Sequence, residues 1–253
     1  MTAESRDASL PPGLGQALAD AQRWAVMTGS GISAESGVPT FRDAQVGLWE
    51  QYDAEELATP EAFVSNPQLV WDWYVWRREL VAAADPNAGH RALARLATLK
   101  PGLALITQNV DGLHQRAGNE DVIEFHGRID RDRCFSCKQV PKTIIGSDQR
   151  PPPCPCCGGP LRPDVVWFGE AISHIVLERA LEAATGCDLF LSVGTSSLVY
   201  PAAGLAEAAA ARGATIVEIN TNPTPLTPRA DFPLQGLATF WLPAIVAGVE
   251  RAG

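Results

Sequence analysis

Three polar segments of this chain carry residue types that could bind a nucleotide and move a proton. Residues 29–34 (Gly-Ser-Gly-Ile-Ser-Ala) fit the pattern Gly-x-Gly-x-x-Ala, whose glycines let a phosphate approach the backbone. The other two segments are residues 108–111 (Gln-Asn-Val-Asp) and His126 with Gly127. Each follows an apolar, strand-prone run, and open α/β sheets bind ligands at the carboxyl ends of their strands. Together the segments predict a dinucleotide pocket that His126 faces.

Four cysteines form two pairs with the spacing of metal ligands. A stretch of 16 residues separates the pairs, and two glycines follow the second. Two Cys-x-x-Cys pairs present four thiolates tetrahedrally, which suits a structural Zn²⁺ and leaves no open coordination position for chemistry. The predicted ligands are Cys134, Cys137, Cys154 and Cys157.

The other two cysteines are interpreted separately. Cys156 lies inside the second pair and could replace a neighbour as a ligand, although the spacing favours Cys154 and Cys157. Cys187 precedes an apolar run and is expected to be a buried structural thiol. The amino terminus has no apolar signal-peptide core, which favours metal binding over disulfides and predicts a cytoplasmic location.

Apolar runs are predicted to be the strands that position the polar segments. Continuous apolar runs suit parallel strands that are buried on both faces. They cover residues 24–28, 103–107, 122–125, 189–193 and 215–219. Helical patterns lie between them at residues 89–98, 173–184 and 202–212. This alternation predicts an α/β fold with a Rossmann-like doubly wound parallel sheet.

Two segments interrupt the alternation of strand and helix. Residues 43–88 show no strand and contain a tryptophan-rich helical pattern, and residues 130–162 are rich in cysteine and proline. We expect them to pack together as a smaller domain with a helical module and a zinc-binding module. The sheet domain would then comprise residues 22–42, 89–129 and 163–253, preceded by a flexible arm at residues 1–21.

Composition argues against several classes of function. Of the 253 residues, 46% are hydrophobic and 19% are charged, as in a globular enzyme. A net charge of −9 gives no basic surface for nucleic acids or acidic membranes, and no apolar run approaches the roughly 20 residues of a membrane span. The acidic balance is compatible with lysine-bearing protein segments as ligands, and a monomer is expected.

The glycine loop differs from that of a dehydrogenase in two respects. Pro39 interrupts the helix that should follow the glycines. No second strand follows to bring an acidic residue to the ribose about 20 residues further on. The loop is therefore expected to bind a dinucleotide in another arrangement.

Taken in chain order, the motifs resemble those of the sirtuin family over about residues 22–245. The segments that carry the resemblance are residues 29–42, 108–111, 125–127, the two cysteine pairs, 166–170 (Val-Trp-Phe-Gly-Glu), 194–196 (Gly-Thr-Ser) and 218–220 (Glu-Ile-Asn). Ser30 is a departure, because the family usually has alanine there. A serine is small enough for the loop to close normally.

The resemblance implies an NAD-dependent protein-lysine deacylase, which transfers an acyl group from lysine to ADP-ribose and releases nicotinamide. This chemistry needs a base that takes a proton from a ribose hydroxyl. His126 is the expected base, because an unperturbed pKa of about 6.5 suits proton removal at neutral pH. Asn109 is the second expected catalytic residue. Of the other histidines, His90 is expected at a helix entry, His114 is expected to orient its neighbours, and His174 is expected in solvent.

The same resemblance assigns cofactor roles to the glycine loop and to the ends of the strands. Asp111 and the Ile32 backbone are expected at the nicotinamide carboxamide, Phe41 at the reactive face and Asn220 at the adenosine ribose. The full set expected to bind NAD is Gly29, Ser30, Gly31, Ile32, Ser33, Ala34, Glu35, Thr40, Phe41, Arg42, Gln108, Asn109, Val110, Asp111, Gly194, Thr195, Ser196, Asn220, Thr221, Asn222 and Ala238.

The substrate is expected to be an acyl-lysine in a protein or peptide. By resemblance, residues 166–170 pair with the substrate backbone as a strand and line the acyl-lysine tunnel. Tyr74 and Arg77 lie three apart on one helical face and resemble the sirtuin class that removes succinyl, malonyl or glutaryl groups. An arginine fork and a phenol can bind the carboxylate of such a group. The expected substrate residues are Ala58, Tyr74, Arg77, Val166, Trp167, Phe168, Gly169 and Glu170.

Other interpretations stay open at this point. The enzyme could be a plain deacetylase in which Arg77 points away from the tunnel. The chain could be a zinc-ribbon module that contacts nucleic acid or a partner without catalysis, which the acidic charge argues against. It could also bind NAD without turnover, although the presence of both His126 and Asn109 favours an active enzyme.

Overall fold

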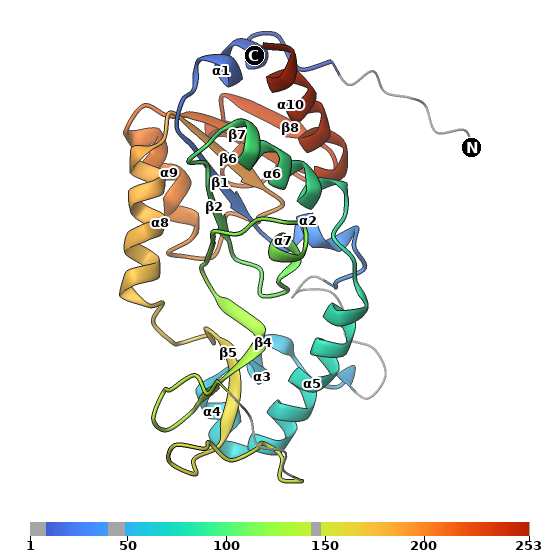
Figure 1. The fold of residues 1–253 in the computed structure, drawn as a ribbon, viewed down its shortest axis with the longest axis vertical. Helices are drawn as coiled ribbons and strands as arrows, with labels where there is room; N and C mark the ends of the chain where they lie inside the picture. The colour runs from blue at the N-terminus through green and yellow to red at the C-terminus, as the bar shows by residue number, and fades with distance from the viewer. Residues whose placement is uncertain (1–8, 40–48, 143–147, 253) are drawn as a thin grey trace, which may run out of the picture.

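In the computed structural model, which describes residues 9–39, 49–142 and 148–252, a six-stranded sheet forms the centre of the larger part of the molecule (Figure 1). Its strands are β1 (Trp24–Thr28), β2 (Ala104–Thr107), β3 (Val122–Glu124), β6 (Leu189–Val193), β7 (Thr215–Asn220) and β8 (Phe232–Gln235). Every neighbouring pair is parallel. The expected α/β fold class is therefore confirmed.

The strand order of this sheet reverses beside β1. The order is β3-β2-β1-β6-β7-β8, so the chain leaves β1 toward one edge and later returns to its other side with β6. Ligands of open α/β sheets bind at such a reversal, outside the carboxyl ends of the strands. The turns after β1 and β6 are therefore where a cofactor pocket is expected.

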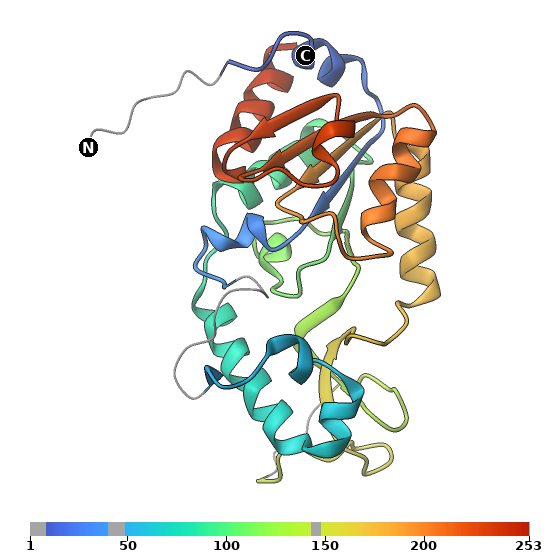
Figure 2. The ribbon, with the colours of Figure 1, turned by 180° about the vertical axis from the view of Figure 1, so that it is seen from behind.

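Helices cover both faces of the sheet (Figures 1 and 2). Alternate residues of β1 point to the two faces, so Trp24 and Val26 join one buried cluster while Ala25 and Met27 join the other. The first face carries α1 (Leu14–Asp20), α6 (Ala88–Leu99) and α10 (Ala238–Ala252). The second face carries α8 (His174–Gly186) and α9 (Ala203–Ala211).

A smaller part of the molecule lies beyond the carboxyl ends of the strands (Figure 2). It contains α3 (Ala54–Leu57), α4 (Pro60–Ser65), α5 (Pro67–Ala83) and the antiparallel pair β4 (Gly127–Cys134) and β5 (Leu161–Val165). Helix residues Phe63 and Trp73 share a buried cluster with Ile129 of β4 and with Trp167. The two segments that interrupt the strand–helix alternation thus pack against each other.

Short helical elements complete the described structure. They are α2 (Gly31–Ala34), α7 (Leu113–Arg116) and the 3₁₀ turn η2 (Thr227–Arg229). Within the described ranges, no helix is long and apolar enough to cross a membrane.

Two features of the fold differ from the sequence-based expectations. The described part of the expected flexible arm contains α1, whose Leu14 and Leu18 are fully buried, because one turn of helix aligns them against α10. The flexible-arm expectation is wrong for this stretch. The carboxyl-terminal β8 and α10 were not predicted, since Pro233 and Pro243 interrupt their patterns.

Candidate active site and metal centre

The polar segments singled out in the sequence meet at the carboxyl edge of the sheet. Gly29 follows β1, Gln108 follows β2 and Gly194 follows β6. Backbone hydrogen bonds link these turns: Gln108 N donates to Thr28 O at 2.9 Å, and Gly29 N donates to Val193 O at 2.9 Å. The expected convergence of the segments is confirmed.

The glycines of the first turn are needed for close contact with the turn after β6. A Cβ atom on Gly31 would lie 2.8 Å from Gly194 Cα, and one on Gly29 would lie 2.8 Å from Thr195 Cα. Gly194 has a φ of +59°, and a Cβ there would lie 2.6 Å from Ile32 N. The two turns therefore pack backbone against backbone, and α2 begins directly at this contact.

Polar side chains beside the glycine loop form a buried hydrogen-bonded cluster. The Asn109 amide donates to Gly29 O and to Ser33 Oγ, both at 3.1 Å. Ser33 Oγ in turn donates to Asp111 Oδ2 at 2.7 Å, and Leu113 N donates to the other carboxylate oxygen at 2.9 Å. Burial raises the pKa of Asp111, and these hydrogen bonds oppose that shift. The cluster fixes the catalytic candidate Asn109 against the loop.

His126 lies at the end of β3, next to the same segment. Its Nδ1 is 3.1 Å from Gln108 O. Because a carbonyl oxygen only accepts, Nδ1 carries the proton and Nε2 is left as an acceptor. Burial lowers the pKa of His126, so the neutral ring that a base requires is favoured.

The remaining histidines have the structural positions that were expected. His90 accepts from Asn87 N at 3.3 Å in a capping box at the start of α6. His114 is buried, and its Nε2 is 2.9 Å from Thr28 Oγ1. Burial lowers the pKa of His90 to about 4 and that of His114 to about 3, so both rings stay neutral. His174 is exposed.

A second group of polar side chains lines the ends of β6 and β7. Gln108 Nε2 donates to Thr195 Oγ1 at 2.9 Å, and Asn220 Nδ2 donates to Thr195 O at 2.8 Å. Ser197 Oγ is buried and has no hydrogen-bond partner among the described residues. An unsatisfied hydroxyl at the strand reversal is a fitting contact for a phosphate or ribose oxygen.

The sequence interpretation missed the role of Glu218. Its buried carboxylate accepts from Thr224 Oγ1 and, at 2.6 Å, from Thr227 Oγ1. Glu218 therefore stabilises the turn that follows Asn220. Among the other expected cofactor residues, Thr221 and Asn222 are exposed beside this turn, whereas Ala238 is buried at the start of α10. Thr40, Phe41 and Arg42 lie outside the described residues.

The expected acyl-pocket residues come together from α5 and from the segment after β5. Tyr74 is 4% exposed, and its Oη accepts from Trp167 Nε1 at 2.9 Å. Arg77 Cζ lies 5.0 Å from the centre of the Trp73 ring. Burial lowers the pKa of Arg77.

The segment of residues 166–170 is held by backbone hydrogen bonds on both sides. Val166 N donates to His126 O, and Phe168 N donates to Ala58 O, each at 2.9 Å. Glu170 accepts from Trp167 N at 3.0 Å and forms an ion pair with Arg162. The segment thus connects the candidate base His126 to small, buried Ala58, while the Phe168 side chain is 43% exposed.

The four predicted metal ligands form one compact group. The Sγ atoms of Cys134, Cys137, Cys154 and Cys157 all lie within 4.8 Å of one another, with separations of 3.5 Å and 3.8 Å for two pairs. Four tetrahedral Zn–S bonds of about 2.3 Å place sulfur atoms about 3.8 Å apart. The donor set therefore fits one structural Zn²⁺. Cys187 is buried away from this group, as expected.

Cys156 and Cys157 are neighbouring exposed cysteines, and only Cys157 belongs to the group. We expect Cys157→Ser to lose bound zinc and to destabilise the module formed by β4 and β5, because ligation supplies its folding energy. Cys156→Ser is the matched control and should keep one zinc ion per chain. Metal content measured by atomic emission tests this, and loss of zinc from Cys156→Ser would contradict the ligand assignment.

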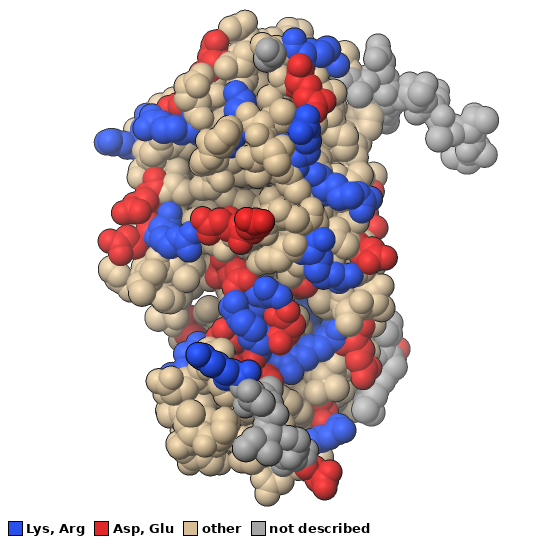
Figure 3. Space-filling model, viewed as in Figure 1, with Lys and Arg blue, Asp and Glu red and all other residues tan. Residues whose placement is uncertain are grey.

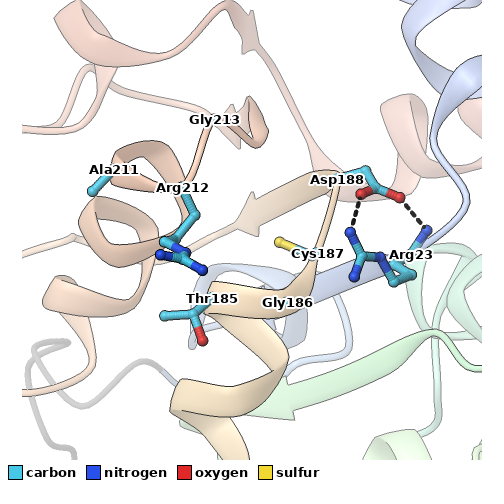
Figure 4. Close-up of a pocket in the computed structure, with 8 residues that line it drawn as sticks. All are labelled: Arg23, Thr185, Gly186, Cys187, Asp188, Ala211, Arg212 and Gly213. Carbon is cyan, nitrogen blue, oxygen red and sulfur yellow. Dashed lines mark hydrogen bonds and ion pairs between the residues drawn. The ribbon is translucent and has the colours of Figure 1, made fainter.

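A cavity of about 510 Å³ lies at the opposite edge of the sheet. Its lining includes Arg23 before β1, Asp188 before β6 and Gly213 before β7, so it opens at the amino ends of the strands. Figure 4 shows the Asp188 carboxylate facing Arg23, with Arg212 on the far side. Hydrogen bonding to Arg23 lowers the pKa of Asp188 to about 2. This edge is separate from the candidate active site.

Charged side chains of both signs alternate on the face shown in Figure 3. Near the junction of the two parts, Arg131 pairs with Glu124 at 2.7 Å and with Asp164 at 3.2 Å. Arg128 also lies 3.5 Å from Glu124. These ion pairs tie β3 to β4 and β5.

Comparisons with known proteins agree with this geometry. A family model described as "Sir2 family" matches residues 29–201. The chain is 48% identical to an NAD-dependent protein deacylase of Methylococcus capsulatus, over 93% of this chain and 95% of that protein. It is 51% identical to NAD-dependent protein deacylase 2 of Pyrobaculum aerophilum, over 92% and 94% of the two chains. A solved complex of a Sir2 homologue with NAD superposes with a TM-score of 0.90 at 44% identity, covering 96% of this chain and 95% of that one.

Proposed function

Because this chain belongs to the Sir2 family of NAD-dependent protein deacylases, we propose that it removes succinyl or malonyl groups, and acetyl groups as well, from lysine. The observation that carries the acyl preference is the placement of Tyr74 and Arg77 three residues apart on α5, with the Arg77 charge close enough to act on the Tyr74 phenol. A phenol and a guanidinium at the same pocket can both donate to a distal carboxylate. An acetyl group lacks that carboxylate and would use only the rest of the tunnel.

NAD fits the carboxyl edge of the sheet. Glycines at positions 29, 31 and 194 keep the turns after β1 and β6 free of side chains at their contact, and Ser197 Oγ is a buried hydroxyl that a cofactor oxygen could satisfy. Bound NAD supplies the ribose carbon that accepts the acyl oxygen, with nicotinamide as the leaving group. The remaining cofactor assignments, Thr40, Phe41 and Arg42 included, are part of this proposal.

The residues of the chain then have distinct tasks. Asn109, fixed by Gly29 O and Ser33, orients the ribose, and Asp111 holds the nicotinamide amide. His126 takes a ribose hydroxyl proton on Nε2, because Nδ1 is committed to Gln108 O. Residues 166–170 bind the peptide backbone as an added strand, which places the acyl-lysine between His126 and α5.

The proposal includes the setting in which the enzyme works. We place it in the cytoplasm as a monomer that acts on lysine-bearing proteins and not on nucleic acids. The net charge of −9 supports this choice of partners, since it favours cationic segments and disfavours phosphate backbones.

Arg77→Met tests the acyl preference. We expect kcat/KM for a succinylated peptide to fall by about 10- to 150-fold, the value of a charge-assisted hydrogen bond of about 1.5–3 kcal/mol. The acetylated form of the same peptide should be affected much less. Initial rates of nicotinamide release with both peptides measure the ratio.

Arg78→Met is the matched control on the same helix. Arg78 Nε donates to Ile129 O at 2.6 Å, and its guanidinium pairs with Asp132, so it stabilises β4 instead of the pocket. This variant should lower stability and leave the ratio of the two activities intact. An equal loss of both activities in Arg77→Met would support the plain deacetylase.

A further inference from the structure

The Trp167 side chain lies between Tyr74 and Arg162. Its Nε1 donates to Tyr74 Oη at 2.9 Å, and the two rings are stacked with planes 29° apart. On the other side, Arg162 Cζ lies 3.2 Å from the centre of the Trp167 ring. All three side chains are buried, at 2%, 4% and 1% exposure for Trp167, Tyr74 and Arg162.

Trp167 is fixed from three directions. Its backbone N donates to Glu170 Oε2 at 3.0 Å, and the same carboxylate accepts from both terminal nitrogens of Arg162, at 2.6 Å and 2.9 Å. Arg162 also donates to Val165 O at 2.5 Å. The indole therefore has one orientation available, with its N–H directed at the phenol oxygen.

The hydrogen bonds that a phenol can make then determine where the O–H proton of Tyr74 points. A phenol oxygen has one O–H to donate and lone pairs to accept. Since Trp167 occupies an acceptor position, the Tyr74 proton must point elsewhere, and in the described residues no other hydrogen bond to Tyr74 Oη is found. Burial raises the pKa of Tyr74 to about 12, so the phenol keeps this proton at neutral pH. A buried donor with a fixed direction is what a ligand carboxylate needs.

We propose that Trp167 is a specificity-determining positioning residue, whose indole N–H turns the phenolic O–H of Tyr74 toward the distal carboxylate of a dicarboxylic acyl-lysine. The inference rests on the proposed function, because it assigns Trp167 a role in the same pocket. Trp167 does not touch the carboxylate itself. It acts through Tyr74, and the Arg162–Glu170 pair holds it in place.

Trp167→Phe keeps an aromatic ring at this position but removes the indole N–H and part of the ring volume. We expect the ratio of kcat/KM for succinylated over acetylated peptide to fall by about three- to tenfold, the range of one neutral hydrogen bond. Most of the fall should appear in KM for the succinylated peptide. A change in the shape of the tunnel would alter kcat/KM for both peptides. The ratio of the two kcat/KM values therefore isolates the effect on the distal carboxylate.

Tyr74→Phe supplies a double-mutant cycle that a purely structural role would not reproduce. In the Tyr74→Phe background, which has no phenolic proton to direct, adding Trp167→Phe should leave the ratio unchanged. Equal falls of the ratio in both backgrounds would overturn the proposal. Trp167→Met, which places a flexible apolar side chain without an N–H at the same position, is the second variant if Trp167→Phe does not fold.

Trp24→Phe is a matched control at the far end of the sheet. Trp24 is also 2% exposed, and its Nε1 donates to Ala21 O at 3.0 Å. Trp24→Phe should lower stability without changing the ratio of kcat/KM for the succinylated over the acetylated peptide. If Arg77→Met lowers the ratio and Trp167→Phe does not, the Trp167 inference fails while the proposed function stands. If neither variant changes the ratio, both fail.

Discussion

Replacing His126 with alanine is expected to lower kcat for deacylation by about 10²- to 10⁴-fold, the range of a lost general base. The imidazole stands at the end of β3, with Nδ1 committed to Gln108 O and Nε2 available as an acceptor. Its removal leaves the glycine turns and the Asn109 cluster intact, so NAD should still bind. Single-turnover deacylation and calorimetric titration with NAD measure the two quantities separately.

His174→Ala is the control for this substitution. His174 has 88% of its side chain exposed at the start of α8, where its Nδ1 lies 3.7 Å from Glu178 Oε2. Its replacement should leave kcat unchanged. If His126→Ala turns over at the wild-type rate, the assignment of the base is wrong.

The pH dependence of kcat/KM reports on the same residue in the free enzyme. Burial lowers the pKa of His126 below its ordinary value of about 6.5. The base is active when neutral, so activity is present above the lowered pKa and is lost as the pH falls through it. The acid limb of the profile should therefore lie below about pH 6.5, and an acid limb above that value would contradict this environment for His126.

The central sheet could be predicted from the sequence because its strands are continuous apolar runs. Residues 24–28 and 189–193 coincide with β1 and β6, since both strands are buried on both faces and show no alternation to misplace their ends. The last strand and helix have weaker signals. β8 is an edge strand that tolerates Pro233, and α10 continues through Pro243 because burial of Leu242 and Ile245 outweighs the lost hydrogen bond.

The sequence predicts only those parts of the candidate site that directly follow predicted strands, because the end of a strand locates the side chains that come after it. Gln108, Asn109 and His126 follow apolar runs directly, so their meeting at one edge follows from parallel pairing. Contacts between distant parts of the chain carry no such signal. The bond from Trp167 to Tyr74 spans 93 residues and depends on how α5 packs against the segment after β5. The sequence predicted Tyr74 as a pocket residue from its spacing to Arg77 and Trp167 from the family resemblance, but neither argument connected the two residues.

The glycines show how structure changes an interpretation that sequence alone supports. In the sequence, Gly29 and Gly31 suggest close approach of a phosphate to the backbone. In the structure, both are already required by contact with Gly194 and Thr195, before any ligand is considered. The same residue type therefore serves two purposes, which are to join the turns after β1 and β6 and to keep the edge open for the cofactor.

Gly194→Ala is accordingly expected to destabilise the protein by about 2–5 kcal/mol and to abolish measurable NAD binding. A left-handed φ costs a non-glycine residue about 1–2 kcal/mol, and forcing a methyl group against Ile32 N and Gly31 adds an overpacking cost of about 1–3 kcal/mol. Relief of the clash must separate the turns after β1 and β6, where we propose that the cofactor binds. Denaturant unfolding and titration with NAD measure the two effects.

Gly213→Ala separates the clash from the backbone conformation. Gly213 also has a left-handed φ, +85°, but a Cβ there would meet nothing within 4 Å, and it lies at the amino end of β7. Gly213→Ala should lower the free energy of unfolding only by the cost of the left-handed conformation, about 1–2 kcal/mol, and NAD binding should persist. Gly194→Ala and Gly213→Ala could also lower the free energy of unfolding equally. In that case the turns after β1 and β6 separate without cost, and glycine is needed at position 194 only for its left-handed conformation.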